Sequence, residues 1–171
     1  MRHRRTVNLL LNALDEYQRI LSSIESACFT VTYDNLGSYA QLYTHIVRAN
    51  LRALLAIQKC VQRRTLVRRK GITMLGWLVL CSRRFPPQKN DPVSVSTIVK
   101  AKQQDIRNEL LTLRRRILEL VPEIDKSSPS FRVKHPRLGM LNARQWLRFM
   151  QIHTCHHLKQ LRLIQAAAGK R

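Results

Sequence analysis

Apolar residues recur at steps of three and four positions along most of the chain, which is the spacing of one face of an α-helix. The first such stretch has its apolar positions at Val7, Leu10, Leu14, Tyr17, Leu21, Ile24 and Cys28. We therefore expect a first helix over this stretch, with one face packed against the rest of the protein.

A second helix is predicted to begin at Ser38. Ser38 and Gln41 have the spacing of a capping box, in which each side chain bonds the backbone N–H of the other residue. The apolar stripe that follows contains Leu42, Ile46, Ala49, Ala53 and Ile57. This stripe is expected to face the interior.

Two further helices are predicted in the second half of the chain. The third is expected over residues 97–121, ended by Pro122 because a proline ring cannot continue a regular helix. The fourth is expected to start at Asn142, which forms a second capping-box pair with Gln145, and to run to about Ala168. Four long amphipathic helices joined by one long crossover predict an all-α four-helix bundle.

The crossover between the second and third helices is placed at residues 62–93. It contains a basic run at 63–70 and an apolar stretch at 72–81, which we expect to form a short helix on the bundle. The basic residues beside this stretch also fit a membrane-surface helix. Covering a core is the commoner use of such a segment, so no membrane partner is expected. Residues 127–141 are expected to form an ordered loop.

Length and composition fit one domain over residues 1–171, with a basic tail at residues 1–5. Apolar residues make up 44% of the chain and only five residues are glycine, as suits a helical protein with a full core. The four cysteines show no C-x-x-C spacing, which indicates reduced thiols in a cytoplasmic protein. The longest apolar run, at 72–81, is far shorter than the roughly 18 residues of a membrane span.

The charge is unusual, because 31 Lys and Arg stand against 10 Asp and Glu and give a formal net charge of +21. Such an excess attracts polyanions. The basic residues are spread over every segment, however, and no nucleic-acid motif is present. A basic, non-enzymatic helical module that binds nucleic acid or another polyanion is therefore the alternative hypothesis. Steep weakening of binding with salt would identify it.

The last predicted helix carries two histidines on its inward face. That face consists of Trp146, Met150, His153, His157, Leu161 and Ile164. His153 and His157 are four residues apart, so their rings stand one helical turn apart and can reach one metal ion. His45 lies on the interior stripe of the second helix. Three imidazoles from two helices can form a three-ligand metal site with an open position.

Neighbouring residues bear on the chemistry of this site. Residue 154 is Thr, so the general-base Glu of H-E-x-x-H metalloproteases is missing. His156 is rotated by about 100° from the stripe, which makes it a ligand, a neighbour of the ligands or a surface residue. Imidazole ligands suit several divalent metals, with zinc or nickel expected ahead of iron or manganese. The alternative is a set of core histidines that are only hydrogen-bonded and bind no metal. Metal analysis of untagged protein would distinguish the two hypotheses.

The sequence resembles the DinB-like superfamily, most clearly in its carboxy-terminal third. An H-P-x-x-G element at 135–139, a W-x-x-F element at 146–149 and an I-H-x-x-H-H-x-x-Q element at 152–160 carry the resemblance. The stretch 38–54, which contains His45, is similar as well. The resemblance implies an up–down–down–up bundle, often homodimeric, in which His45, His153 and His157 bind a divalent cation.

The resemblance also bears on function. Some members of this superfamily are metal-dependent thiol transferases that use bacillithiol, mycothiol or glutathione, and others are similar to maleylpyruvate isomerases. The leading hypothesis is a metal-dependent S-transferase or hydrolase that acts on a small molecule, with a low-molecular-weight thiol as a candidate cofactor. His156, His135 and Tyr43 are candidates to complete the pocket, and no catalytic residue is assigned. Kinship of fold alone does not settle the reaction.

Overall fold

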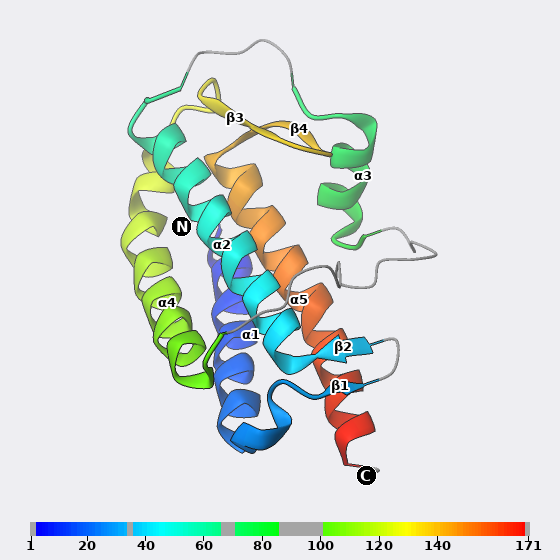
Figure 1. The fold of residues 1–171 in the computed structure, drawn as a ribbon. Helices are drawn as coiled ribbons and strands as arrows, with labels where there is room; N and C mark the ends of the chain where they lie inside the picture. The colour runs from blue at the N-terminus through cyan, green and yellow to red at the C-terminus, as the bar shows by residue number, and fades with distance from the viewer. Residues whose placement is uncertain (1–2, 34–35, 66–70, 86–100, 170–171) are drawn as a thin grey trace.

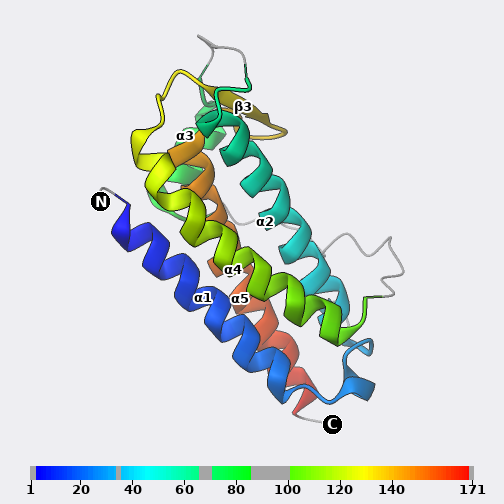
Figure 2. The same ribbon diagram turned by 90° about the vertical axis from the view of Figure 1, so that its left-hand side faces the viewer.

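The computed structural model describes residues 3–33, 36–65, 71–85 and 101–169. Its four long helices lie side by side: α1 (Arg4–Ser23), α2 (Tyr39–Val61), α4 (Gln103–Lys126) and α5 (Ala143–Ala168). Helices α1 and α5 run in one direction, and α2 and α4 run in the other (Figures 1 and 2). The mainly helical fold confirms the predicted fold class, and the helix directions are those that the family resemblance implies.

The apolar faces of these helices form one continuous core. Its fully buried side chains include Leu10 and Tyr17 of α1, Ile46 of α2, Leu113 of α4 and Ile164 of α5. Four of them, Leu10, Tyr17, Ile46 and Ile164, occupy positions on the predicted apolar stripes. The three-and-four spacing therefore identified the inward faces correctly.

α1 ends at Ser23, earlier than its apolar spacing suggested. The backbone becomes extended at Ile24, and the last predicted seam position belongs to a short 3-10 helix (Ser26–Cys28). The side-chain amide of Gln103, from the start of α4, donates to the carbonyls of Leu21 and Ile24 at 2.7 and 3.0 Å. Carbonyls at a helix end have no partner within the helix, so this neighbouring amide stabilises the early ending.

Both predicted capping boxes are confirmed. The Ser38 side chain accepts the N–H of Gln41 at 3.2 Å, and the Gln41 side chain accepts the N–H of Ser38 at 2.9 Å. Asn142 and Gln145 form the same reciprocal pair at the start of α5, with both distances 3.0 Å. These bonds satisfy backbone donors and fix the starts of the two helices that carry the histidines.

The prediction that Pro122 ends the third long helix is wrong, because α4 continues through it to Lys126. Pro122 lies on the exposed side, whereas Val121 and Ile124 are buried in the core. Burial of these apolar side chains offsets the backbone hydrogen bond that proline cannot make. The predicted start of this helix, at residues 97–100, lies outside the described residues, and α4 begins at Gln103.

Two short antiparallel ribbons join the helices, and the sequence did not predict them. β1 (Thr32–Tyr33) pairs with β2 (Gly37–Ser38), and β3 (Arg132–His135) pairs with β4 (Gly139–Asn142). The β3–β4 ribbon replaces much of the loop expected at residues 127–141. Its turn requires the φ of +86° at the glycine that opens β4, a left-handed conformation that other residues rarely adopt.

The short helix predicted in the crossover is α3 (Met74–Ser82), which packs against α5. Thr73 caps its start by accepting the N–H of Gly76 at 3.0 Å. α3 lies so close to the β3–β4 ribbon that a Cβ at Gly76 would collide with the carbonyl oxygen of Leu138. The crossover residues 66–70 and 86–93 lie outside the described part of the chain. No helix in the described part has the length and hydropathy needed to cross a membrane.

Candidate metal centre

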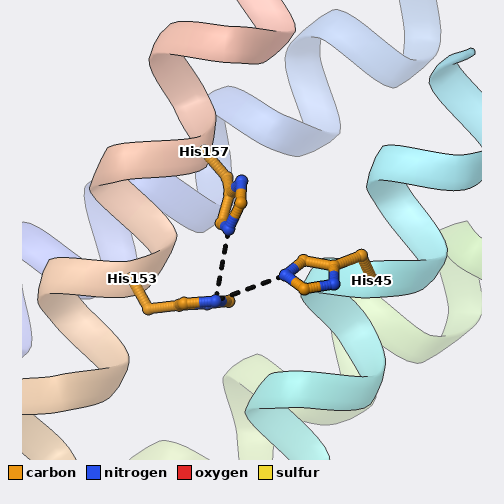
Figure 3. Close-up of side chains that lie close together, drawn as sticks. All are labelled: His45, His153 and His157. Atoms are coloured by element: carbon orange, nitrogen blue, oxygen red, sulfur yellow. Dashed lines mark hydrogen bonds between the residues drawn. The ribbon is translucent and has the colours of Figure 1, made fainter. Parts of the chain in front are cut away.

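Three histidine side chains converge between α2 and α5. His45 lies on α2, and His153 and His157 lie one turn apart on α5 (Figure 3). The Nε2 atom of His153 lies 3.3 Å from Nε2 of His45 and 3.2 Å from Nε2 of His157. The structure therefore brings together the three residues that the sequence predicts as metal ligands.

The spacing of the three nitrogens fits a single metal ion. One ring nitrogen from each histidine lies within 4.8 Å of the other two. The separation of the His45 and His157 nitrogens is taken at this upper limit of 4.8 Å, and the other two separations are 3.3 and 3.2 Å. The point equidistant from all three nitrogens then lies about 2.4 Å from each, close to the roughly 2.0–2.1 Å of a zinc–imidazole bond. If His45 and His157 are closer than the limit, this distance is shorter. Adjustments of a few tenths of an ångström would complete the coordination.

A cation explains this convergence better than hydrogen bonds among the rings. A neutral imidazole has one nitrogen that donates and one that accepts. If the rings only bonded one another, Nε2 of His153, which carries either one proton or one lone pair, would have to serve both neighbouring Nε2 atoms at 3.2 and 3.3 Å. A metal ion accepts a lone pair from each of the three nitrogens, so all three are satisfied at once.

Gln160 orients His157 toward the centre. The Oε1 atom of Gln160 lies 2.6 Å from Nδ1 of His157. An amide oxygen can only accept, so Nδ1 carries the proton and Nε2 keeps its lone pair for a metal. Gln160 was not among the predicted site residues, although its position three residues after His157 places both side chains on the same face of α5.

Burial keeps the rings of His153 and His157 uncharged, as metal ligands must be. Loss of water around His153, with further repulsion from His157 and His45, lowers its pKa to about 2. Burial likewise lowers the pKa of His157 to about 4, although the bond to Gln160 opposes that shift. Both rings are therefore neutral at pH 7 in the metal-free protein. No proton has to leave them before a cation binds at that pH.

A buried polar pair fixes α2 against α5 beside the histidines. The Thr154 hydroxyl donates to Oδ1 of Asn50 at 3.2 Å and accepts from its Nδ2 at 3.1 Å. The same amide donates to the Ile46 carbonyl at 2.9 Å, and the Tyr17 hydroxyl donates to the Thr154 carbonyl at 3.2 Å. Unpaired polar groups are costly in a core, so these bonds favour the helix register that aligns the histidines.

Aromatic rings flank the centre on one side. The Phe149 ring lies 5.3 Å from the His153 ring, and the Phe85 ring lies 6.0 Å from it, both measured between centroids. Phe85 follows α3, so the contact between α3 and the β3–β4 ribbon places this ring. Apolar rings reduce access of water to that side and strengthen electrostatic interactions there.

The other candidate residues do not belong to the group of three that could hold a metal ion. His156 is exposed, with its ring 5.1 Å from His157 and 5.3 Å from Phe85. His135 closes the β3–β4 turn, where its Nδ1 accepts two backbone N–H groups, and its ring packs 4.5 Å from Phe149. Tyr43 is buried in the core, where its hydroxyl donates to a carbonyl of α1 at 2.7 Å and burial raises its pKa.

A mainly helical protein with three inward imidazoles on two antiparallel helices belongs to the class of histidine-lined bundles that can hold a divalent cation. The comparison with family models narrows this class. The model of the DinB superfamily matches residues 3–161, and the chain belongs to that superfamily. No curated protein and no solved structure matches the chain.

Proposed function

We propose that this protein is a metal-dependent enzyme that binds one divalent cation through His45, His153 and His157. Zinc and nickel are the metals that we propose ahead of iron and manganese. The observation that carries the proposal is the convergence of three Nε2 atoms from two helices, with neighbouring separations of 3.2 and 3.3 Å. Three protein ligands leave at least one coordination position open, as in catalytic rather than structural sites.

A bound cation would lower the pKa of a water or a small thiol and so supply a nucleophile at neutral pH. The protein residues prepare the centre for this chemistry. Gln160 holds the tautomer of His157, and the buried Asn50–Thr154 pair holds the two helices in register. Phe85 and Phe149 exclude water from one side of the centre.

The class of reaction follows from this arrangement and from family membership. We propose transfer of a low-molecular-weight thiol to a small electrophile, or hydrolysis by water, in a homodimeric cytoplasmic protein. The net charge of +21 favours an anionic thiol or substrate. His156 is the exposed imidazole nearest the centre and is the residue to examine first as a proton carrier.

Metal analysis tests the proposal. We expect untagged wild-type protein to hold about one equivalent of zinc or nickel per chain, and His153→Ala to hold less than about a tenth. His156→Ala is the matched control, because it removes an imidazole from the same helix outside the triad. The proposal would be contradicted if wild-type protein were purified without metal and took up no zinc, nickel or manganese on incubation. A thiol-transfer screen on the loaded protein then separates the two reactions.

A further inference from the structure

The outer side of α3 carries an apolar stripe that no described part of the chain covers. Met74, Trp77 and Leu78 are 91%, 59% and 47% exposed, and Cys81 is also exposed. These positions are spaced by three, four and seven residues, so they form one line along the helix. Gly76, Val79 and Leu80 are buried on the opposite side of the helix. α3 is thus apolar on both sides, and the described residues pack against one of them.

The segments that adjoin α3 are basic and are called its basic border here. Arg83 and Arg84 follow α3 directly and are exposed. Lys134 and Arg137 are exposed on the β3–β4 ribbon, which contacts α3 at Gly76, on the side away from the stripe. Acidic residues are missing from these segments of the sequence. No Asp or Glu occurs between Asp34 and Asp91, and none follows Asp125. An apolar stripe with a basic border is complementary to a surface that is negative outside and apolar beneath.

We propose that α3 is a docking helix for an anionic lipid bilayer, which it enters to interfacial depth without crossing. Trp77 and Leu78 would insert below the headgroups, while Arg83, Arg84 and Lys134 would contact acidic headgroups. Tryptophan suits this boundary because its ring is apolar and its N–H remains hydrogen-bonded. The proposal goes beyond the metal centre and does not depend on it.

Charge complementarity favours a bilayer over other occupants. A second copy that met this stripe through the same face would bring its own basic border against the first, and the like charges would repel each other there. This does not bear on a homodimer that forms through another face. Nucleic acid would match the border, but it offers no apolar layer for Met74, Trp77 and Leu78. The apolar stretch was predicted to cover the core. One side of α3 does so through Val79 and Leu80, and no described residue covers the other side.

The firm attachment of α3 makes it suitable as a docking element. The Thr73 N–H donates to the Leu138 carbonyl at 3.0 Å, and the Met140 N–H donates to the Gly71 carbonyl at 3.0 Å. Together with the close approach at Gly76, these bonds hold the helix against the ribbon. A helix that is already folded and held loses little conformational entropy when it meets a surface.

Fluorescence with lipid vesicles tests the proposal. Trp146 is only 5% exposed, so a change in emission on lipid binding reports mainly on Trp77. We expect the full-length protein to bind phosphatidylcholine vesicles that contain about 30 mol% phosphatidylserine, with a blue shift of emission. Binding to pure phosphatidylcholine should be much weaker, and quenchers placed just below the headgroups should reduce the emission.

Net charge alone could attract the protein to acidic vesicles, so paired variants are needed. We expect Trp77→Gln/Leu78→Gln to weaken partitioning by about tenfold or more. Leu111→Gln is the control, because Leu111 is 52% exposed on α4, and it should stay within about twofold of wild type. Arg84→Gln/Lys134→Gln should weaken binding more than Arg115→Gln/Arg116→Gln, which removes the same charge from α4.

Three results would overturn the proposal. The first is equal vesicle binding by wild type and Trp77→Gln/Leu78→Gln, which would show attraction by charge only. The second is buried-type Trp77 emission in the lipid-free protein at every concentration, which would mean that another part of the chain covers the stripe. The third is a blue shift that develops with protein concentration alone, which would assign the stripe to a second copy.

Discussion

Replacing Gln160 by methionine tests whether the residue prepares His157 for metal binding. The amide oxygen accepts the Nδ1 proton of His157 at 2.6 Å, a short bond that fixes both the tautomer and the ring orientation. Methionine keeps the length of the side chain but cannot accept that proton strongly. Loss of such a partner of a metal ligand typically weakens metal affinity by about 10–100-fold, or about 1.4–2.7 kcal/mol.

The assay is a competition titration with zinc and a chromophoric chelator at pH 7.5. Gln165→Met is the matched control, because Gln165 is a half-buried glutamine further along α5, beyond the triad. Gln160→Glu should retain wild-type affinity or exceed it, since a carboxylate accepts the same proton more strongly. Wild-type affinity in Gln160→Met, or an equal loss in Gln165→Met, would refute the role assigned to Gln160.

Three further predictions concern stability. The free energy of unfolding of the metal-free protein should fall by about 2 kcal/mol per triad histidine of α5 between pH 7.5 and 5. In the folded protein the pKa values of His153 and His157 are lowered to about 2 and about 4, so both rings stay neutral over this pH range. In the unfolded chain the same rings take up protons below about pH 6.5. Protonation therefore favours the unfolded chain, and stability is lost as the pH falls. Urea titrations at each pH measure this, and a flat profile would contradict it. Thr154→Val should cost about 1–3 kcal/mol by leaving Asn50 without its partner, whereas adding Asn50→Leu should cost less than the sum of the single changes. A double-mutant cycle in urea gives both values, and strict additivity would argue against the pair. Gly76→Ala should cost about 1–3 kcal/mol because its Cβ meets the Leu138 carbonyl, while Gly71→Ala, which has only a side chain at 3.6 Å, should change stability by less than about 0.5 kcal/mol. Equal denaturation midpoints for the two glycine variants would contradict the close contact.

Periodicity and local capping chemistry made much of this fold predictable. The capping-box pairs fixed the starts of α2 and α5 to the residue, because Ser38 and Asn142 act through bonds to residues three positions away. The triad was found by the same reasoning. His153 and His157 are separated by one helical turn, and His45 lies on the inward stripe of α2. The caps and the helix faces depend on residues three or four positions apart, so they can be predicted from the sequence alone.

Features that depend on tertiary contacts could not be read in this way. α4 passes through Pro122 because the neighbouring Val121 and Ile124 gain more from burial than the helix loses. The Asn50–Thr154 pair joins residues 104 positions apart, so no local sequence pattern predicts it. The role of Gln160 could have been predicted, because a polar residue three positions after a predicted ligand is a local signal for a hydrogen-bond partner of its ring.

The distance in sequence between His45 and His153, 108 positions, has a consequence for folding. An ion held by both would act as a removable cross-link that closes a long loop, and such closures restrict the unfolded chain strongly. A nascent chain would be unable to capture the ion tightly until α5 had been synthesised and docked against α2. Loading would then serve as the last step of maturation, after the helices have found their neighbours.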